Sequence, residues 1–193
     1  MFRFLIPLVI CTSALASDAV WKVRDVSAGG KFATTHATLK LESKIQGDRQ
    51  TCIVSDTTGG ERAVTLAWCL PLDAIGGTWF NDPQTSRTIS AATQPYSNLT
   101  NRAGGLTDEA SLYPIAVVAP ARSETATVVA CPPDVPRMVR FVYDAAAKEL
   151  RAEFDFGLSP VPTKYPSCAV ATVIRYEVPA KWAFRQALLC YYD

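Results

Sequence analysis

Alternation of apolar and polar residues is the main pattern along the chain, and it predicts short β-strands. Residues 36–43 place Leu39 and Leu41 on one face and charged residues on the other, and residues 19–26 alternate in the same way. Residues 112–119 and 124–131 are almost continuously apolar. Such runs are expected of strands that are buried on both faces.

The clearest hairpin is predicted over residues 138–157. In its second half Leu150, Ala152, Phe154 and Phe156 face one way, whereas residues 151, 153 and 155 are charged. No segment of a dozen residues shows a convincing helical repeat. Short strands, frequent turns and 13 prolines therefore predict one all-β domain, an antiparallel β-barrel or β-sandwich.

The N-terminus has the features of a secretory signal peptide. Arg3 precedes an apolar stretch over residues 4–11, and Ala14 and Ala16 form a small-residue cleavage site before Ser17. No later segment approaches the roughly 18 apolar residues that a membrane-spanning helix needs. We therefore expect residues 1–16 to be removed and residues 17–193 to form a single secreted, extracellular domain.

Because secreted proteins fold in an oxidising compartment, we expect the cysteines to form disulfides. Cys52 and Cys69 flank a run centred on Gly59-Gly60, where glycine supplies turn geometry. If the chain folds back there, the two cysteines lie nearly opposite each other, within disulfide range. The spacing predicts a stapled hairpin, or two neighbouring strands joined by a loop.

The same spacing recurs near the C-terminus. Cys168 and Cys190 flank a run centred on Pro179-Ala180, which predicts a second stapled hairpin. Cys131 remains as the unpaired cysteine, and the apolar residues before it favour a buried thiol over an intermolecular bridge.

Residues 71–110 are rich in Gly, Ser, Thr, Asn and Pro and predict a long surface loop. Asn98 begins the sequon Asn-Leu-Thr, a candidate glycosylation site. Trp79 and Phe80 are candidate binding residues, because exposed aromatic side chains often anchor interfaces. Alternatively, the two rings tuck under the loop and close one end of the barrel, which is the more ordinary fate of apolar side chains.

The charge balance and the motifs do not predict binding to nucleic acid, a membrane, a metal or a cofactor. The chain has 19 basic and 18 acidic residues, and loss of Arg3 balances them. Close cysteine pairs are absent and His36 is the one histidine, so a zinc or redox site is not expected. A solvent-facing or capping role is expected for His36 rather than a place in a serine triad. Glu153 and Asp155 could form a glycosidase pair, but alternation along one strand explains them as a solvated face.

The segment over residues 19–69 resembles the small secreted fungal proteins related to the major Alternaria allergen. Trp21 and Val23 match the first strand of that family, and Cys52, Trp68 and Cys69 match its first cysteine pair. The family's later pair would correspond to residues 168 and 190. No cysteine of the expected mature chain precedes Cys52, so the family's disulfide-linked dimer is not carried over.

The resemblance implies a disulfide-stapled β-barrel without catalytic machinery that acts outside a fungal cell. The predicted function is therefore that of an effector- or allergen-like protein that engages a host extracellular protein or glycan. Two alternatives stay open: a carrier of a small apolar ligand inside a barrel, and a secreted hydrolase with an unrecognised site.

Overall fold

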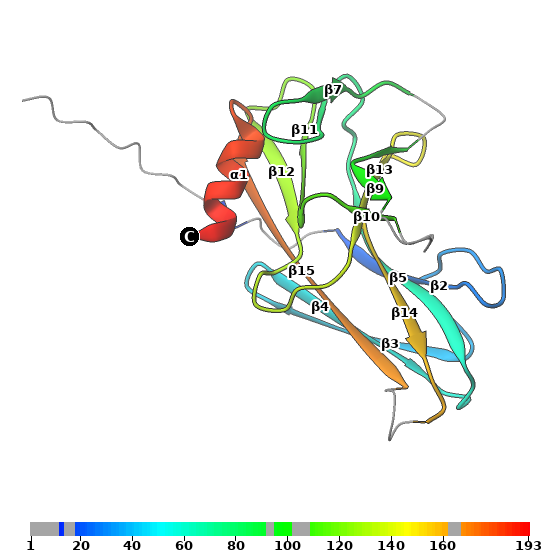
Figure 1. Cartoon of the computed structure of the whole chain (residues 1–193). Helices are drawn as coiled ribbons and strands as arrows, with labels where there is room; N and C mark the ends of the chain where they lie inside the picture. The colour runs from blue at the N-terminus through cyan, green and yellow to red at the C-terminus, as the bar shows by residue number, and fades with distance from the viewer. Residues whose placement is uncertain (1–11, 14–17, 92–94, 102–108, 162–166) are drawn as a thin grey trace, which may run out of the picture.

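The computed structural model describes residues 12–13, 18–91, 95–101, 109–161 and 167–193. In these ranges the chain forms two antiparallel sheets, a two-stranded ribbon and one short helix (Figure 1). The two sheets pack face to face and each has open edges, so the described part is sandwich-like and forms no closed barrel. The all-β prediction is confirmed at this level, and of its two architectures the sandwich is correct.

The larger sheet has eight strands in the order β3–β4–β15–β12–β11–β6–β7, with β1 beside β15. Its strands are β1 (Thr12–Ser13), β3 (Leu39–Gln46), β4 (Arg49–Asp56), β6 (Thr78–Phe80), β7 (Ser86–Thr88), β11 (Ile115–Ala119), β12 (Thr125–Ala130) and β15 (Cys168–Pro179).

The smaller sheet has five strands in the order β2–β5–β14–β13–β8. Its strands are β2 (Val20–Asp25), β5 (Arg62–Pro71), β8 (Tyr96–Ser97), β13 (Arg140–Asp144) and β14 (Glu149–Leu158). The ribbon pairs β9 (Leu99–Asn101) with β10 (Glu109–Ser111). The predicted hairpin over residues 138–157 is confirmed as β13 and β14, with Phe141 opposite Ala152.

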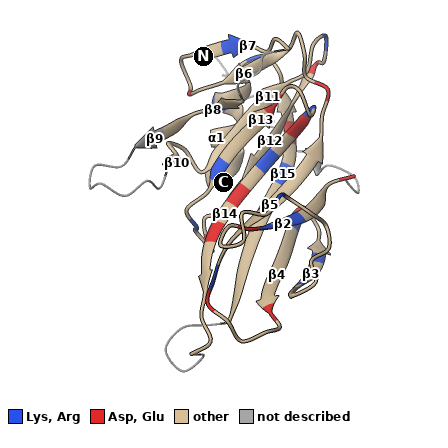
Figure 2. Cartoon of the chain, turned by 90° about the vertical axis from the view of Figure 1, so that its right-hand side faces the viewer, with Lys and Arg blue, Asp and Glu red and all other residues tan. Residues whose placement is uncertain are grey.

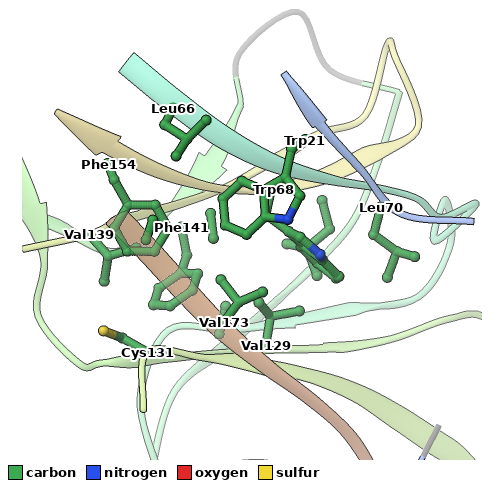
Figure 3. Close-up of a cluster of buried hydrophobic side chains, with 14 of the residues drawn as sticks. Trp21, Leu66, Trp68, Leu70, Val129, Cys131, Val139, Phe141, Phe154 and Val173 are labelled. Atoms are coloured by element: carbon green, nitrogen blue, oxygen red, sulfur yellow. The ribbon is translucent and has the colours of Figure 1, made fainter. Parts of the chain in front are cut away.

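The main core fills the space between the two sheets (Figure 3). Trp68, Phe141 and Phe154 from the smaller sheet are fully buried, and Val129 and Val173 meet them from the larger sheet. One polar contact crosses this core, because Trp68 Nε1 donates a hydrogen bond of 2.7 Å to Gln50 Oε1 on β4. This contact satisfies an indole N–H that would otherwise be buried without a partner.

A second core lies on the outer face of the larger sheet, under helix α1 (Ala183–Tyr192). Phe184, Ala187 and Tyr191 of α1 are buried against apolar residues of β11, β12 and β15. Tyr176 on β15 donates a hydrogen bond of 2.8 Å to the carbonyl of Ala187. This second cover explains why β11 is apolar on both faces.

The predicted staple between Cys52 and Cys69 is wrong, because both cysteines are free thiols. The turn between them forms, with Gly59 at φ 72° and Asp56 accepting hydrogen bonds from the backbone of Thr58 and Gly60. However, it carries the chain from β4 in the larger sheet to β5 in the smaller sheet, which are not neighbours. The two cysteines therefore lie in different sheets and not on one hairpin.

The predicted staple between Cys168 and Cys190 is also wrong, because Cys168 is an exposed free thiol at the start of β15. The chain does turn after Pro179, but residues 183–192 form α1 instead of a returning strand. Cys190 therefore does not face Cys168 across a ladder. Cys131 is a buried free thiol, as expected for the unpaired cysteine.

Residues 71–110 are more structured than a long loop, and five short strands, β6 to β10, lie wholly or partly in this region. Trp79 on β6 is fully buried, so its role as an exposed anchor is wrong and the alternative, a ring tucked into the protein, is correct. Its backbone pairs with Val118 of β11, which places the ring in the main core. Phe80 is partly buried against the second core.

Replacing Trp79 with alanine is expected to lower the free energy of unfolding by about 3–5 kcal/mol, because a large cavity opens in the main core. Trp182→Ala is the matched control: its side chain is 62% exposed, and the expected change is less than about 1 kcal/mol. Denaturant unfolding of both variants checks this pair. Equal losses of stability would contradict the assignment of Trp79 to the core.

Candidate functional site

A surface hollow lies between the β6–β7 turn and the beginning of α1. Phe80 and the turn residues 82–86 form one wall, and Trp182, Phe184 and Arg185 form the other, around a volume of about 320 Å³. One wall thus comes from the region in which the sequence predicted a binding loop, and the other from a segment that had no predicted role. A volume near 300 Å³ lies at the lower end of the range for ligand pockets.

Trp182 is the most conspicuous residue of the hollow. It precedes the first helical residue of α1 and has a left-handed backbone conformation, with φ 65° and ψ 24°. A bulky residue at positive φ is uncommon and costs of order 1–3 kcal/mol. The side chain is nevertheless 62% exposed, so core packing does not explain why tryptophan occupies this position.

Arg185 contacts both walls. Its Nε donates a hydrogen bond of 3.4 Å to the carbonyl of Pro83, and its guanidinium lies 5.0 Å from the centre of the Trp182 ring. Contacts of a guanidinium with an indole face are attractive. The arrangement therefore fixes the arginine and the tryptophan relative to the β6–β7 turn.

The β6–β7 turn is organised by Asp82. Its Oδ1 accepts hydrogen bonds of 2.7 Å from the backbone N–H groups of Gln84 and Thr85, and its Oδ2 accepts one of 2.6 Å from the Thr85 hydroxyl. These bonds, led by that of the Thr85 hydroxyl, hold the pKa of Asp82 below its ordinary value. The carboxylate is thus ionised at neutral pH and occupied by its own turn.

Glu153 and Asp155 alternate along β14 with the core residues Ala152 and Phe154, so they lie on the outer face of the smaller sheet. Figure 2 colours the acidic and basic positions along the strands. Arg140 binds both carboxylates, and Arg151 Nε donates a hydrogen bond of 2.9 Å to Glu153. Burial opposes ionisation of Asp155, but hydrogen bonds from Arg140 and Thr65 hold its pKa below the ordinary value. A general acid must carry a proton, so this arrangement supports a structural role for the pair.

A broader hollow of about 550 Å³ crosses this same face. Arg24 donates a hydrogen bond to the neutral Thr65 hydroxyl, and Arg140 is paired with Asp155. Phe32 lies against this face and contacts the guanidinium of Arg24 at 4.8 Å and that of Arg151 at 5.8 Å. The carboxylate of Asp155 is thus paired, whereas Arg24 Nε is buried without a hydrogen-bond partner among the described residues. The hollow at Trp182 is the stronger candidate site, because it holds an exposed aromatic side chain.

Two other residues named from the sequence have local roles. His36 Nδ1 accepts a hydrogen bond of 3.3 Å from the backbone N–H of Thr38, just before β3, which matches the capping role expected for it. Asn98 is half-buried, and its amide nitrogen donates a hydrogen bond of 3.2 Å to the carbonyl of Asn81. A glycan would replace one of the two N–H bonds of that nitrogen, and the remaining N–H could still donate to Asn81.

Within the described ranges, no group of three or more His, Cys, Asp or Glu side chains is arranged to hold a metal ion. In the same ranges no helix is long and apolar enough to cross a membrane.

The comparisons with known proteins are sparse. No family model matches the sequence, and no curated protein is significantly similar to it. A crystal structure of the GH36 α-galactosidase AgaA from Geobacillus stearothermophilus is distantly similar, with a TM-score of 0.38 and 8% identity over 83% of this chain. A doubly substituted form of that enzyme in complex with stachyose has a TM-score of 0.34 and 7% identity, again over 83% of this chain. The chain spans only 30% and 29% of those two chains, and similarity at this level carries no functional argument.

The four free thiols of the described residues are expected to differ sharply in reactivity. Burial raises the pKa of Cys52 and of Cys69 to about 12 and also raises that of Cys131, whereas Cys168 is exposed. Because the thiolate is the reactive form, iodoacetamide at pH 8 should modify Cys168 in the native protein and spare the other three. Peptide mapping checks this, with denatured protein as the control in which all four react. Rapid native modification of Cys52 would contradict its placement in the core.

Proposed function

We propose that this chain is a secreted, non-catalytic protein that binds a host extracellular macromolecule through the hollow at Trp182. The observation that carries the proposal is an exposed tryptophan held in a strained backbone conformation beside a concave surface. Strain of this kind is found disproportionately at functional sites. Tryptophan and arginine are also the side chains most enriched among binding hot spots.

The proposal keeps the effector- or allergen-like role implied by the sequence and moves the binding residues. Trp79 is replaced by Trp182 as the aromatic anchor, and Phe80 remains as part of the wall. The filled space between the sheets favours binding at the outer surface over a carrier with a ligand inside. The pairing of Glu153 and Asp155 with arginines likewise favours binding over hydrolysis.

Export predicts a defined N-terminus. The protein recovered from the medium is expected to begin at Ser17, because a signal peptidase would cut after Ala16. Intact-mass measurement checks this, and a mass shift removed by an N-glycosidase and absent from Asn98→Gln would locate the glycan. Exported protein that still carries residues 1–16 would contradict the signal-peptide interpretation. Cleavage would also remove β1, which pairs with Tyr176 and Glu177 of β15.

The Trp182→Ala variant is expected to weaken binding of the captured partner about 30-fold or more, which corresponds to the ~2 kcal/mol of a hot-spot truncation. The partner is first isolated from host extracellular fluid on the immobilised protein, identified, and titrated by calorimetry. Thermal melting should show little change, because the side chain is exposed.

Ile45→Ala is the matched control for this experiment. Ile45 is 61% exposed and lies on β3, at the opposite edge of the larger sheet from β7. Its replacement removes exposed apolar surface without touching the hollow, so affinity should stay at the wild-type value. Wild-type affinity in Trp182→Ala, or an equal loss in Ile45→Ala, would refute the assignment of the site.

A further inference from the structure

The guanidinium of Arg185 has a defined orientation, but part of its hydrogen-bonding capacity is unused. Its Nε is bound to Pro83 and its plane lies against Trp182, whereas its two terminal nitrogens make no hydrogen bond within the described part of the chain. A fixed arginine with free terminal nitrogens matches a carboxylate, which can accept two parallel hydrogen bonds. The hollow therefore offers a donor pair for an anionic group.

The charges around the hollow also favour an anion. Lys181 is exposed directly before Trp182, and the first turn of α1 contains no acidic residue. Asp82 is the one carboxylate that lines the hollow, and its oxygens already accept three hydrogen bonds within the β6–β7 turn. The lining thus has a cation available for a ligand and an anion that is already occupied.

The remaining lining combines a flat apolar surface with neutral polar groups. The exposed indole of Trp182 offers the flat surface, and the side chains of Gln84 and Ser86 form no hydrogen bond to other described residues. A pyranose ring has the matching features, since its C–H groups form an apolar face and its hydroxyls lie around the rim. Amphipathic aromatic rings suit surfaces of this mixed kind.

An extended peptide is the competing occupant, because β7 is an open edge of the larger sheet. However, β7 has only three residues. Its Arg87 is tied to Asn81 by a hydrogen bond of 2.9 Å and to the carbonyl of Ser97 by another of 2.9 Å. Short edge strands that carry charged residues resist strand addition. The edge therefore favours a sugar over a peptide.

We propose that the hollow binds a carboxylate-bearing sugar unit, so that the macromolecule recognised is an acidic polysaccharide. The carboxylate lies against Arg185, the apolar face of the sugar ring stacks on Trp182, and Gln84 and Ser86 bind its hydroxyls. This inference rests on the proposed function of the same hollow and names the chemistry of its partner.

The test compares two forms of one polymer. Oligomers of polygalacturonate and the same oligomers with methyl-esterified carboxyl groups are titrated into the secreted protein by calorimetry. The acidic form should bind at least about tenfold more tightly, and rising NaCl concentration should weaken it, because exposed charges are screened by salt. Equal affinity for the two forms, or no binding of the acidic form, would overturn the inference.

Variants then locate the carboxylate. Arg185→Gln should lower affinity for the acidic oligomer about tenfold or more and leave the weak binding of the ester unchanged, since it removes charge-assisted hydrogen bonds. Arg137→Gln, at an exposed arginine outside the hollow, should bind as the wild type does. If Arg185→Gln retains full affinity, the inference is wrong.

Failure of this inference is distinguishable from failure of the proposed function. A captured partner whose binding depends on Trp182, together with no binding of polygalacturonate, would overturn the acidic-sugar assignment alone. Wild-type binding of every partner by Trp182→Ala would overturn both.

Discussion

The burial of both faces of β11 and β12 is the constraint on which the rest of the structure depends. Side chains at alternate positions of these strands belong to the main core on one face and to the second core on the other. A sheet with two apolar faces needs two covers. The smaller sheet supplies one and α1 supplies the other, and the need to place α1 over this face also places Trp182 beside the β6–β7 turn.

The sandwich is held by packing, by buried hydrogen bonds and by a layer of outer charges. The Trp68–Gln50 hydrogen bond crosses the core where an unpaired indole N–H would be costly. On the outer face of the smaller sheet, arginines 140 and 151 satisfy the carboxylates of β14. Cys52, Cys69 and Cys131 contribute as small buried side chains, since each is a free thiol in the interior. At these three positions the cysteines stabilise the fold through apolar burial.

Alternation predicted the long strands well, because strands such as β2, β13 and β14 turn one face toward the main core. The pattern predicted the hairpin of β13 and β14. It also predicted that β11 is buried on both faces, although it did not show which elements pack against them. It failed where pairing is long-range: nothing in residues 51–69 indicates that the chain crosses from one sheet to the other after β4. Turn chemistry is local and is the same for a hairpin as for a crossing between sheets.

The candidate site was missed for a different reason. The apolar residues Ala183, Phe184, Ala187 and Tyr191 recur with a helical period, and residues 182–192 contain no β-branched side chain. Both signals indicate a helix, but α1 has only ten residues. The spacing of Cys168 and Cys190 instead favoured a hairpin over this segment. The left-handed backbone at Trp182 carries no sequence signal, since glycine or asparagine would be the usual residue there.

The pairing of β4 with β15 has a consequence for how the protein folds. The hydroxyls of Thr51 and Thr172 lie 3.0 Å apart across this pair, yet the two residues are separated by 121 positions. Contacts of such high sequence separation form slowly, because a long loop must be closed before they are made. The centre of the larger sheet therefore cannot assemble until residues 168–179 have been synthesised, because β15 lies between β4 and β12. Until then, β4 and β12 each present an edge without its final neighbour.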